Sequence, residues 1–113
     1  MLKSKNIYKA HEKDIAKQLG GKRQPLSGAL KEAKSDVVSD EFRIDCKYVH
    51  VKSFKLDIDT LRKITVEAFG QELTPMLQVR FEQCGINAEK KYRCVDKDWA
   101  VIPLRIFKDL IDK

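Results

Sequence analysis

The chain has 113 residues, of which 42% are hydrophobic, and this is enough to form one modest hydrophobic core. We therefore expect a single domain over residues 1–113. Lys and Arg outnumber Asp and Glu by 23 to 17, and the net charge of +6 favours a polyanionic partner such as nucleic acid. No apolar run approaches the roughly 18 to 20 residues of a membrane span, and the N-terminus lacks the apolar stretch of a signal peptide. We expect a soluble, cytoplasmic protein without a membrane partner.

The cysteine pattern argues against a structural zinc site. Cys46, Cys84 and Cys94 form no CxxC pair, and only His11 and His50 could join them as ligands. An odd number of cysteines without a signal peptide indicates reduced thiols.

The first expected element is a helix over residues 6–19, which ends at Gly20-Gly21 because glycine commonly terminates helices. Its apolar stripe consists of Tyr8, Ile15 and Leu19. Glu12 falls in the middle of that stripe. A buried carboxylate without a partner is costly, so Glu12 needs a specific reason for its position.

Residues 22–34 are rich in Gly, Pro and Ser and are predicted to form a basic loop. Its cationic side chains are Lys22, Arg23, Lys31 and Lys34. The loop either closes over a phosphate backbone or is a solvated connector. It lacks the Gly-Lys-Ser/Thr of a Walker A loop, and no nucleotide cofactor is expected.

Residues 36–39 and 42–51 are predicted to be two strands joined by a tight turn at Asp40-Glu41. In the second strand, the side chains point alternately to the two faces. One face carries Phe42, Ile44, Cys46 and Tyr48, and the other carries Arg43, Asp45, Lys47 and Val49. Asp45 and Lys47 therefore project from the same face of a half-buried strand.

The rest of the chain predicts a helix over residues 59–71 capped by Asp57 or Asp59, and a last helix that opens at Pro103. Between them, strands are predicted over residues 75–82, 92–95 and 99–102. The resulting order, α-β-β-α-β-β-β-α, is typical of an α/β fold with a mixed central sheet flanked by helices.

Three carboxylates and one lysine stand out: Glu12, Asp36, Asp45 and Lys47. The short turn brings Asp36 near Asp45, so two carboxylates can share a hard cation such as Mg²⁺, with Mn²⁺ as a substitute. Phosphodiester hydrolysis uses such an ion to neutralise developing charge, and Lys47 could orient the attacking water or stabilise the transition state. The alternative is that Asp45 and Lys47 are an ordinary exposed pair on a strand.

A set of motifs runs through nearly the whole chain: Glu12, Gly20-Gly21, Arg23, Ser27-Gly28-Ala29, Asp36-Val37, Phe42-Arg43-Ile44-Asp45-Cys46-Lys47 and Trp99-Ala100-Val101-Ile102-Pro103-Leu104. Together they resemble the archaeal-type Holliday junction resolvases of the PD-(D/E)XK nuclease superfamily. The resemblance implies a restriction-endonuclease-like fold. It implies that Glu12, Asp36 and Asp45 hold the metal and that Lys47 is catalytic. It also implies functional roles for Ser27 and Arg23 in the loop before the first catalytic strand.

Two positions depart from the family pattern. The family more often has glutamate where Asp45 stands, and Ser35 replaces the proline that commonly precedes the first catalytic aspartate. Neither change removes a metal-binding oxygen, so we expect activity to survive and metal preference to shift at most.

The expected function is therefore Mg²⁺-dependent cleavage of four-way DNA junctions by a homodimer, because a two-fold symmetric junction needs two matched active sites. The first alternative is a nuclease for flaps, nicks or mismatches, since repair and restriction nucleases share this fold and core. The second is a branched-DNA-binding module without turnover. A purely binding protein has no need to hold several acids near a phosphate that repels them.

Four further residues have simpler interpretations. Cys46 is expected to be a small core residue, and His50 a solvent-facing residue rather than a phosphate contact. Glu67 is expected at the surface, with a reserve role as an acid near the site. Trp99 is expected in the core or in a dimer interface rather than as a base-stacking platform.

Overall fold

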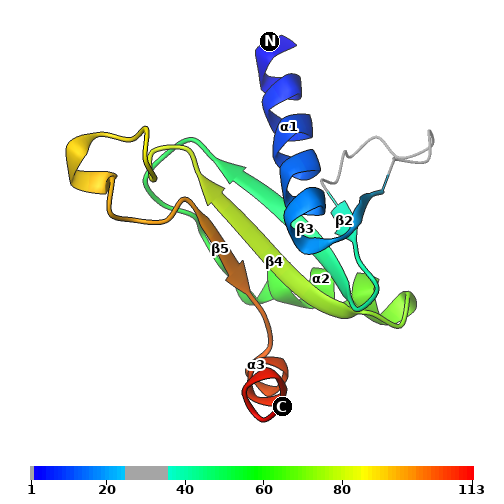
Figure 1. The fold of residues 1–113 in the computed structure, drawn as a ribbon. Helices are drawn as coiled ribbons and strands as arrows, with labels where there is room; N and C mark the ends of the chain where they lie inside the picture. The colour runs from blue at the N-terminus through cyan, green and yellow to red at the C-terminus, as the bar shows by residue number, and fades with distance from the viewer. Residues whose placement is uncertain (1, 25–35) are drawn as a thin grey trace.

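The computed structural model describes residues 2–24 and 36–113, with side chains over residues 6–24 and 37–113 (Figure 1). Its elements are α1 (Leu2–Leu19), β1 (Lys22–Arg23), β2 (Asp36–Val38), β3 (Phe42–Val49), α2 (Ile58–Gly70), β4 (Thr74–Phe81), the 3₁₀ helix η1 (Lys90–Tyr92), β5 (Asp98–Val101) and α3 (Leu104–Ile111). Within these residues, no helix is long and apolar enough to cross a bilayer.

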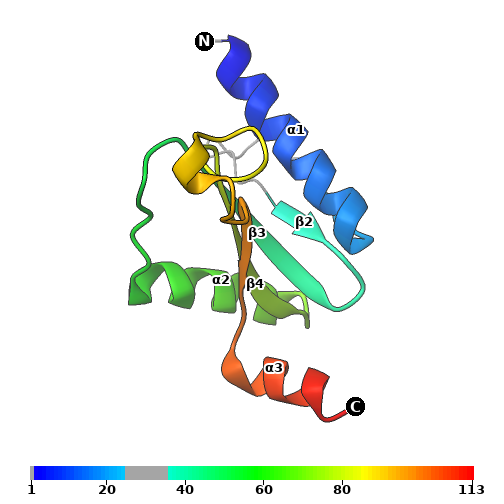
Figure 2. The same cartoon turned by 60° about the vertical axis from the view of Figure 1, so that its left-hand side comes forward.

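The described strands form one five-stranded sheet in the order β1-β2-β3-β4-β5. β3 and β4 pair in parallel, and the other neighbours pair antiparallel. A parallel pair needs a crossover connection, and α2 supplies it between β3 and β4. α1 and α2 lie on opposite sides of the sheet (Figures 1 and 2). The expected α/β class, with a mixed sheet flanked by helices, is confirmed.

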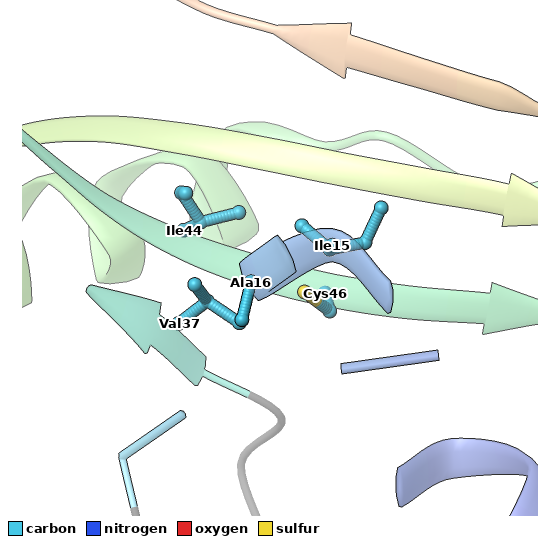
Figure 3. Close-up of a cluster of buried hydrophobic side chains, with 5 residues drawn as sticks. All are labelled: Ile15, Ala16, Val37, Ile44 and Cys46. Carbon is cyan, nitrogen blue, oxygen red and sulfur yellow. The ribbon is translucent and has the colours of Figure 1, made fainter. Parts of the chain in front are cut away.

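One face of the sheet packs against α1. Ile15 and Ala16 of the helix form a buried cluster with Val37 of β2 and with Ile44 and Cys46 of β3 (Figure 3). The period-two alternation of β3 puts its small and branched side chains on this face. Cys46 is therefore a core residue, as the sequence predicts.

The opposite face packs against α2, through a second buried cluster made of Val49, Ile64, Leu77 and Val79. Asp45 and Lys47 have the same parity along β3 as Val49. They also pair in register with Leu77 and Val79 of β4. Both therefore lie on the α2 face.

The end of α1 and the start of α2 have the local structure that the sequence predicts. Gly20 has a φ of 69°, a conformation that favours glycine, and it ends α1. A Cβ on Gly21 would stand 2.8 Å from the carbonyl oxygen of Val38, so the α1–β1 connection passes too close to β2 for a side chain. At the start of α2, Asp57 is the N-cap and accepts a hydrogen bond from Thr60 N at 2.9 Å.

Residues 92–95 are not the strand that the sequence predicts. Tyr92 ends η1, and a turn follows it. The backbone N–H of Tyr92 donates to Glu89 O at 2.8 Å, and that of Val95 donates to Tyr92 O at 3.1 Å. These local bonds occupy the donors that a strand would offer to a neighbour.

Other boundaries also differ from the prediction. Lys22 and Arg23, expected in a loop, form a two-residue edge strand that pairs with Val38 and Val37. On α1, Leu19 is 43% exposed, and His11 takes a buried position beside Ile15 instead. Trp99 is 51% exposed, so it is not a core residue of the single chain.

Candidate functional site

The strongest candidate site lies where β2 and β3 pair. Asp36 and Asp45 are direct register partners, as the predicted hairpin requires. Lys47 Nζ lies 3.5 Å from Asp45 Oδ2. The side chain of Asp45 is only 13% exposed, whereas that of Lys47 is 43% exposed. The shielded carboxylate of Asp45 is suited to a metal cation, and the ammonium of Lys47 reaches solvent, where it can contact an anionic ligand.

Arg43, on the same strand, links this face of β3 to the C-terminal end of α2. Arg43 precedes Asp45 on the same face of β3 and donates a hydrogen bond to Gln71. Its guanidinium Nε also lies 3.9 Å from Glu67 Oε1. Glu67 is thus a partly buried partner of Arg43, rather than a fully exposed surface residue.

Glu12 lies on the other side of the sheet, on α1. It is 8% exposed, and its carboxylate accepts a hydrogen bond from Arg23 Nε at 2.9 Å. This ion pair supplies the partner that a buried carboxylate needs. The ion pair also connects α1 to the edge strand β1. The guanidinium of Arg23 is therefore bound by Glu12, although it remains a candidate for contacting phosphate.

The structure does not bring Glu12 and Asp45 into one described cluster. Among the residues whose side chains are described, no group of three or more His, Cys, Asp or Glu could hold a metal. The side chain of Asp36 lies outside that part of the chain. Ser27, Lys31 and Lys34 also lie outside the described residues, and Lys22 is exposed on β1.

Carboxylate oxygens from Asp36 and Asp45 are donors that Mg²⁺ prefers. Their pairing in register is the feature of this structure that fits such an ion.

A buried polar network on the α1 face was not found from the sequence. His11 Nε2 lies 2.6 Å from Gln78 Oε1, and Gln78 Nε2 donates to Asp98 Oδ1 at 3.1 Å. Arg80 donates to both oxygens of Asp98, from Nε at 2.7 Å and from a terminal nitrogen at 2.9 Å. Arg80 also donates to Asp14. The network therefore joins α1, β4 and β5.

The network sets the charge state of its members. Burial lowers the pKa of His11 and outweighs its hydrogen bond to Gln78, so the imidazole stays neutral. Burial tends to lower the pKa of Arg80. The hydrogen bonds from Arg80 to Asp98 and Asp14 outweigh burial, so the pKa of Arg80 lies above its ordinary value. Burial tends to raise the pKa of Asp98, yet the bonds from Arg80 hold it below its ordinary value.

An aromatic cluster adjoins this network at the same end of the sheet. His50 Nε2 lies 3.3 Å from the Tyr8 hydroxyl, and His50 Nδ1 lies 3.2 Å from Glu82 Oε1. The Tyr48 hydroxyl donates to the same oxygen at 3.2 Å, and the Tyr48 ring meets that of Tyr8 edge-on. Burial, and then the bond to Glu82, raises the pKa of Tyr48. His50 is exposed, as predicted, but it is fixed by two partners.

Comparison of the chain with protein-family models, with curated proteins and with solved structures found no match. The resemblance to the junction resolvases therefore rests on the motifs in the sequence alone.

Proposed function

We propose that the chain is a metal-dependent endonuclease that cleaves branched DNA, with the four-way junction as its main substrate. The observation that carries the proposal is the pairing of Asp36 with Asp45, with Lys47 Nζ 3.5 Å from the Asp45 carboxylate. Two acids and a lysine on adjacent strands are the groups that metal-assisted phosphodiester hydrolysis uses.

In this proposal, Asp36 and Asp45 hold Mg²⁺, which would neutralise charge that develops on the scissile phosphate. Lys47 is already oriented by Asp45 and is nearly half exposed, so its ammonium can reach a phosphate oxygen. A fixed cation there stabilises charge that appears only as the water attacks. Glu12, held by Arg23, would act on the position of the basic edge strand rather than at the phosphate.

The charge of the chain supports DNA as the substrate. The net charge of +6 favours a polyanion, and Lys22 on the edge strand is exposed. A binding module without turnover would gain nothing from acids near a phosphate, which is why we prefer the nuclease.

The homodimer is part of the proposal, and two exposed apolar surfaces support it. None of the eight residues of α3 is buried, and its apolar face carries Leu104, Phe107, Leu110 and Ile111. Figures 1 and 2 show α3 beyond the end of β5, away from α1. On α2, Ile58, Val66 and Phe69 are also exposed. Apolar patches of this kind mark protein interfaces.

A second copy can cover both surfaces at once. If α3 of each copy packs on α2 of the other, one two-fold axis relates both contacts. The polar face of α3, with Arg105, Lys108 and Asp109, then stays in water.

The test of the proposed activity is a gel assay on a synthetic four-way junction in Mg²⁺, with flap, nicked, linear and single-stranded DNA beside it. The wild-type chain should cut the junction, and Asp45→Asn should bind the junction but not cut it. Asp109→Asn on α3 is the matched control, and its cutting should equal that of the wild type. Uncut junction with the wild-type chain, or undiminished cutting by Asp45→Asn, would refute the proposal. Faster cutting of flaps than of junctions would show that the flap, and not the four-way junction, is the main substrate.

A further inference from the structure

A cavity of about 560 Å³ opens at the carboxyl ends of the parallel strands β3 and β4. This volume lies within the range of about 300 to 1,000 Å³ that is common for small-ligand sites. Open α/β sheets often bind ligands outside the carboxyl ends of their strands. The cavity is separate from the Asp45–Lys47 pair, which lies in the middle of β3 on the α2 face.

The floor of the cavity is fixed before any ligand arrives. Arg80 forms part of it, and two carboxylates, Asp14 and Asp98, hold the guanidinium from different elements. Because its donors are already shared between two acids, Arg80 supplies shape rather than a free charge. A rigid floor lowers the entropy cost of binding.

The outer wall is the segment between β4 and β5, residues 82–97. The backbone N–H of Phe81 donates to Lys97 O at 2.8 Å, which closes the base of this segment. The N–H of Gly85 donates to Tyr92 O at 3.3 Å across its middle. Gly85 has a φ of 100°, which favours glycine, so this turn is built into the sequence. The wall is therefore a defined structure.

The lining combines one aromatic ring, apolar side chains and cations. Tyr48 lines the cavity from β3, and Ile86 and Val95 line it from the outer wall. Arg93 and Lys97 also line it, and neither forms an ion pair with any described residue. Aromatic and apolar walls suit a nucleobase, and unpaired cations suit its phosphate.

Two acids, Glu82 and Asp96, line the cavity, and Glu82 lies beside the aromatic ring. Glu82 accepts a hydrogen bond from the Tyr48 hydroxyl and keeps further acceptor capacity. A carboxylate beside the aromatic ring can receive an exocyclic amino group of a base, and it repels a bare polyphosphate. The lining therefore favours a base with one phosphate over an inorganic anion.

We propose that this cavity binds a single unpaired nucleotide, with the base against Tyr48 and the phosphate at Arg93 and Lys97. The nucleotide can be free in solution or can be an unstacked residue of a DNA strand. Binding here is a recognition event and not the cleavage step. It is independent of the proposed nuclease activity, since Asp45→Asn should abolish cutting and leave nucleotide binding unchanged.

The first experiment is a titration of the ¹⁵N-labelled chain with deoxyadenosine monophosphate, followed by amide chemical shifts. The signals of Gly85 and Cys94, which line the cavity, should move with a dissociation constant in the millimolar range or below. Deoxyadenosine alone and inorganic phosphate alone should each bind about tenfold more weakly. No movement of these signals, or equal movement with phosphate alone, would overturn the proposal.

Variants separate the base contact from the phosphate contact. Tyr48→Ala should weaken deoxyadenosine monophosphate about tenfold, and Tyr48→Phe, which keeps the ring, is the control. Lys97→Ala, which changes an exposed side chain, should weaken the nucleotide several-fold and leave deoxyadenosine unchanged. Its control is Lys108→Ala on α3. Unchanged nucleotide affinity in Lys97→Ala would contradict the proposed site.

A second experiment distinguishes the two sources of the nucleotide. A four-way junction with one unpaired adenosine at its centre is compared with a fully paired junction, using wild type and Lys97→Ala. If Lys97→Ala loses affinity only for the junction with the unpaired nucleotide, the cavity is assigned to DNA. If Lys97→Ala binds both junctions as the wild type does but still binds the free nucleotide more weakly, the cavity is assigned to a free nucleotide.

Discussion

Removing the carboxylate of Asp98 should strongly destabilise the fold. This side chain accepts two bonds from Arg80 and one from Gln78, at 2.7, 2.9 and 3.1 Å. In Asp98→Ala, Arg80 keeps only its bond to Asp14, although its side chain is just 11% exposed. Breaking a buried ion pair costs about 3 to 5 kcal/mol. Because Asp98 is itself 24% exposed, we expect a loss near the lower end, about 3 kcal/mol.

The measurement is thermal unfolding followed by circular dichroism. A loss of about 3 kcal/mol should lower Tm by roughly 10 to 20 °C in a domain of this size. Asp109→Ala, which removes an exposed carboxylate from α3, should change Tm by only a degree or two. The double variant Arg80→Met/Asp98→Ala should recover part of the loss, because it no longer leaves a buried charge poorly paired. If Asp98→Ala unfolds at the same temperature as Asp109→Ala, the network does not stabilise the fold as argued.

Four other predictions concern catalysis, assembly, salt and pH. Lys47→Ala should lower single-turnover cleavage about 10²-fold at saturating DNA, and Lys47→Arg should restore only part of it; normal cleavage by Lys47→Ala would make the lysine a surface charge. Phe107→Glu should turn a dimer into a monomer in sedimentation velocity, and a monomeric wild type would contradict the proposed interface. Junction affinity should fall steeply with salt if the basic residues within 22–34 and 90–93 contact phosphate, whereas a flat slope would show that they do not. Stability in urea should fall as the pH drops below about 6.5, because the unfolded chain protonates His11 while its lowered pKa in the fold resists protonation; a flat profile between pH 7 and 5 would count against a buried neutral imidazole.

The acidic members of the network extend that pH dependence. The bond from Arg80 lowers the pKa of Asp14, and the pKa of Asp98 is also lowered despite its burial. A carboxylate with a lowered pKa stabilises the fold above its unfolded value of 3.8, and the contribution disappears as the pH falls through the folded value. The free energy of unfolding should therefore decrease in two pH ranges, first below about pH 6.5 through His11 and then below about pH 4 through these two acids.

The hairpin that carries the candidate site was predictable because its signals are local. The turn at Asp40-Glu41 and the alternation along β3 fix which residues face each other, and Asp36 does pair with Asp45. The preference for an N-cap side chain that accepts a backbone bond narrowed the cap of α2 to Asp57 or Asp59, and Asp57 is the N-cap in the structure. Such features depend on neighbours within a few residues.

The position of Glu12 relative to that hairpin was not predictable. A helical period identifies the buried side of α1, but not which face of the sheet the helix covers. Its ion pair with Arg23 depends on the short strand β1, and a two-residue strand has no pattern that distinguishes it from a loop.

The network was missed for a similar reason. Gln78 and Arg80 are polar residues in a strand, a pattern that usually indicates a solvent-exposed face. They are buried because Asp14 and His11, more than 60 positions away in the sequence, pair with them. A signal was nevertheless present, since His11 lies one helical turn before Ile15 on the inward side of α1.

The agreement between strand order in the sheet and strand order along the chain has a kinetic consequence. Each of the strands β2 to β5 pairs with the strand that precedes it, and the β2–β3 pairing closes the shortest connection, residues 39–41, at the smallest entropy cost. The parallel pairing of β3 with β4 is different, because residues 50–73 must first fold back across the sheet. We expect the docking of α2 on this pair to limit the refolding rate. Mutations at Ile64 should then slow refolding, whereas mutations in the β4–β5 connection should mainly speed unfolding.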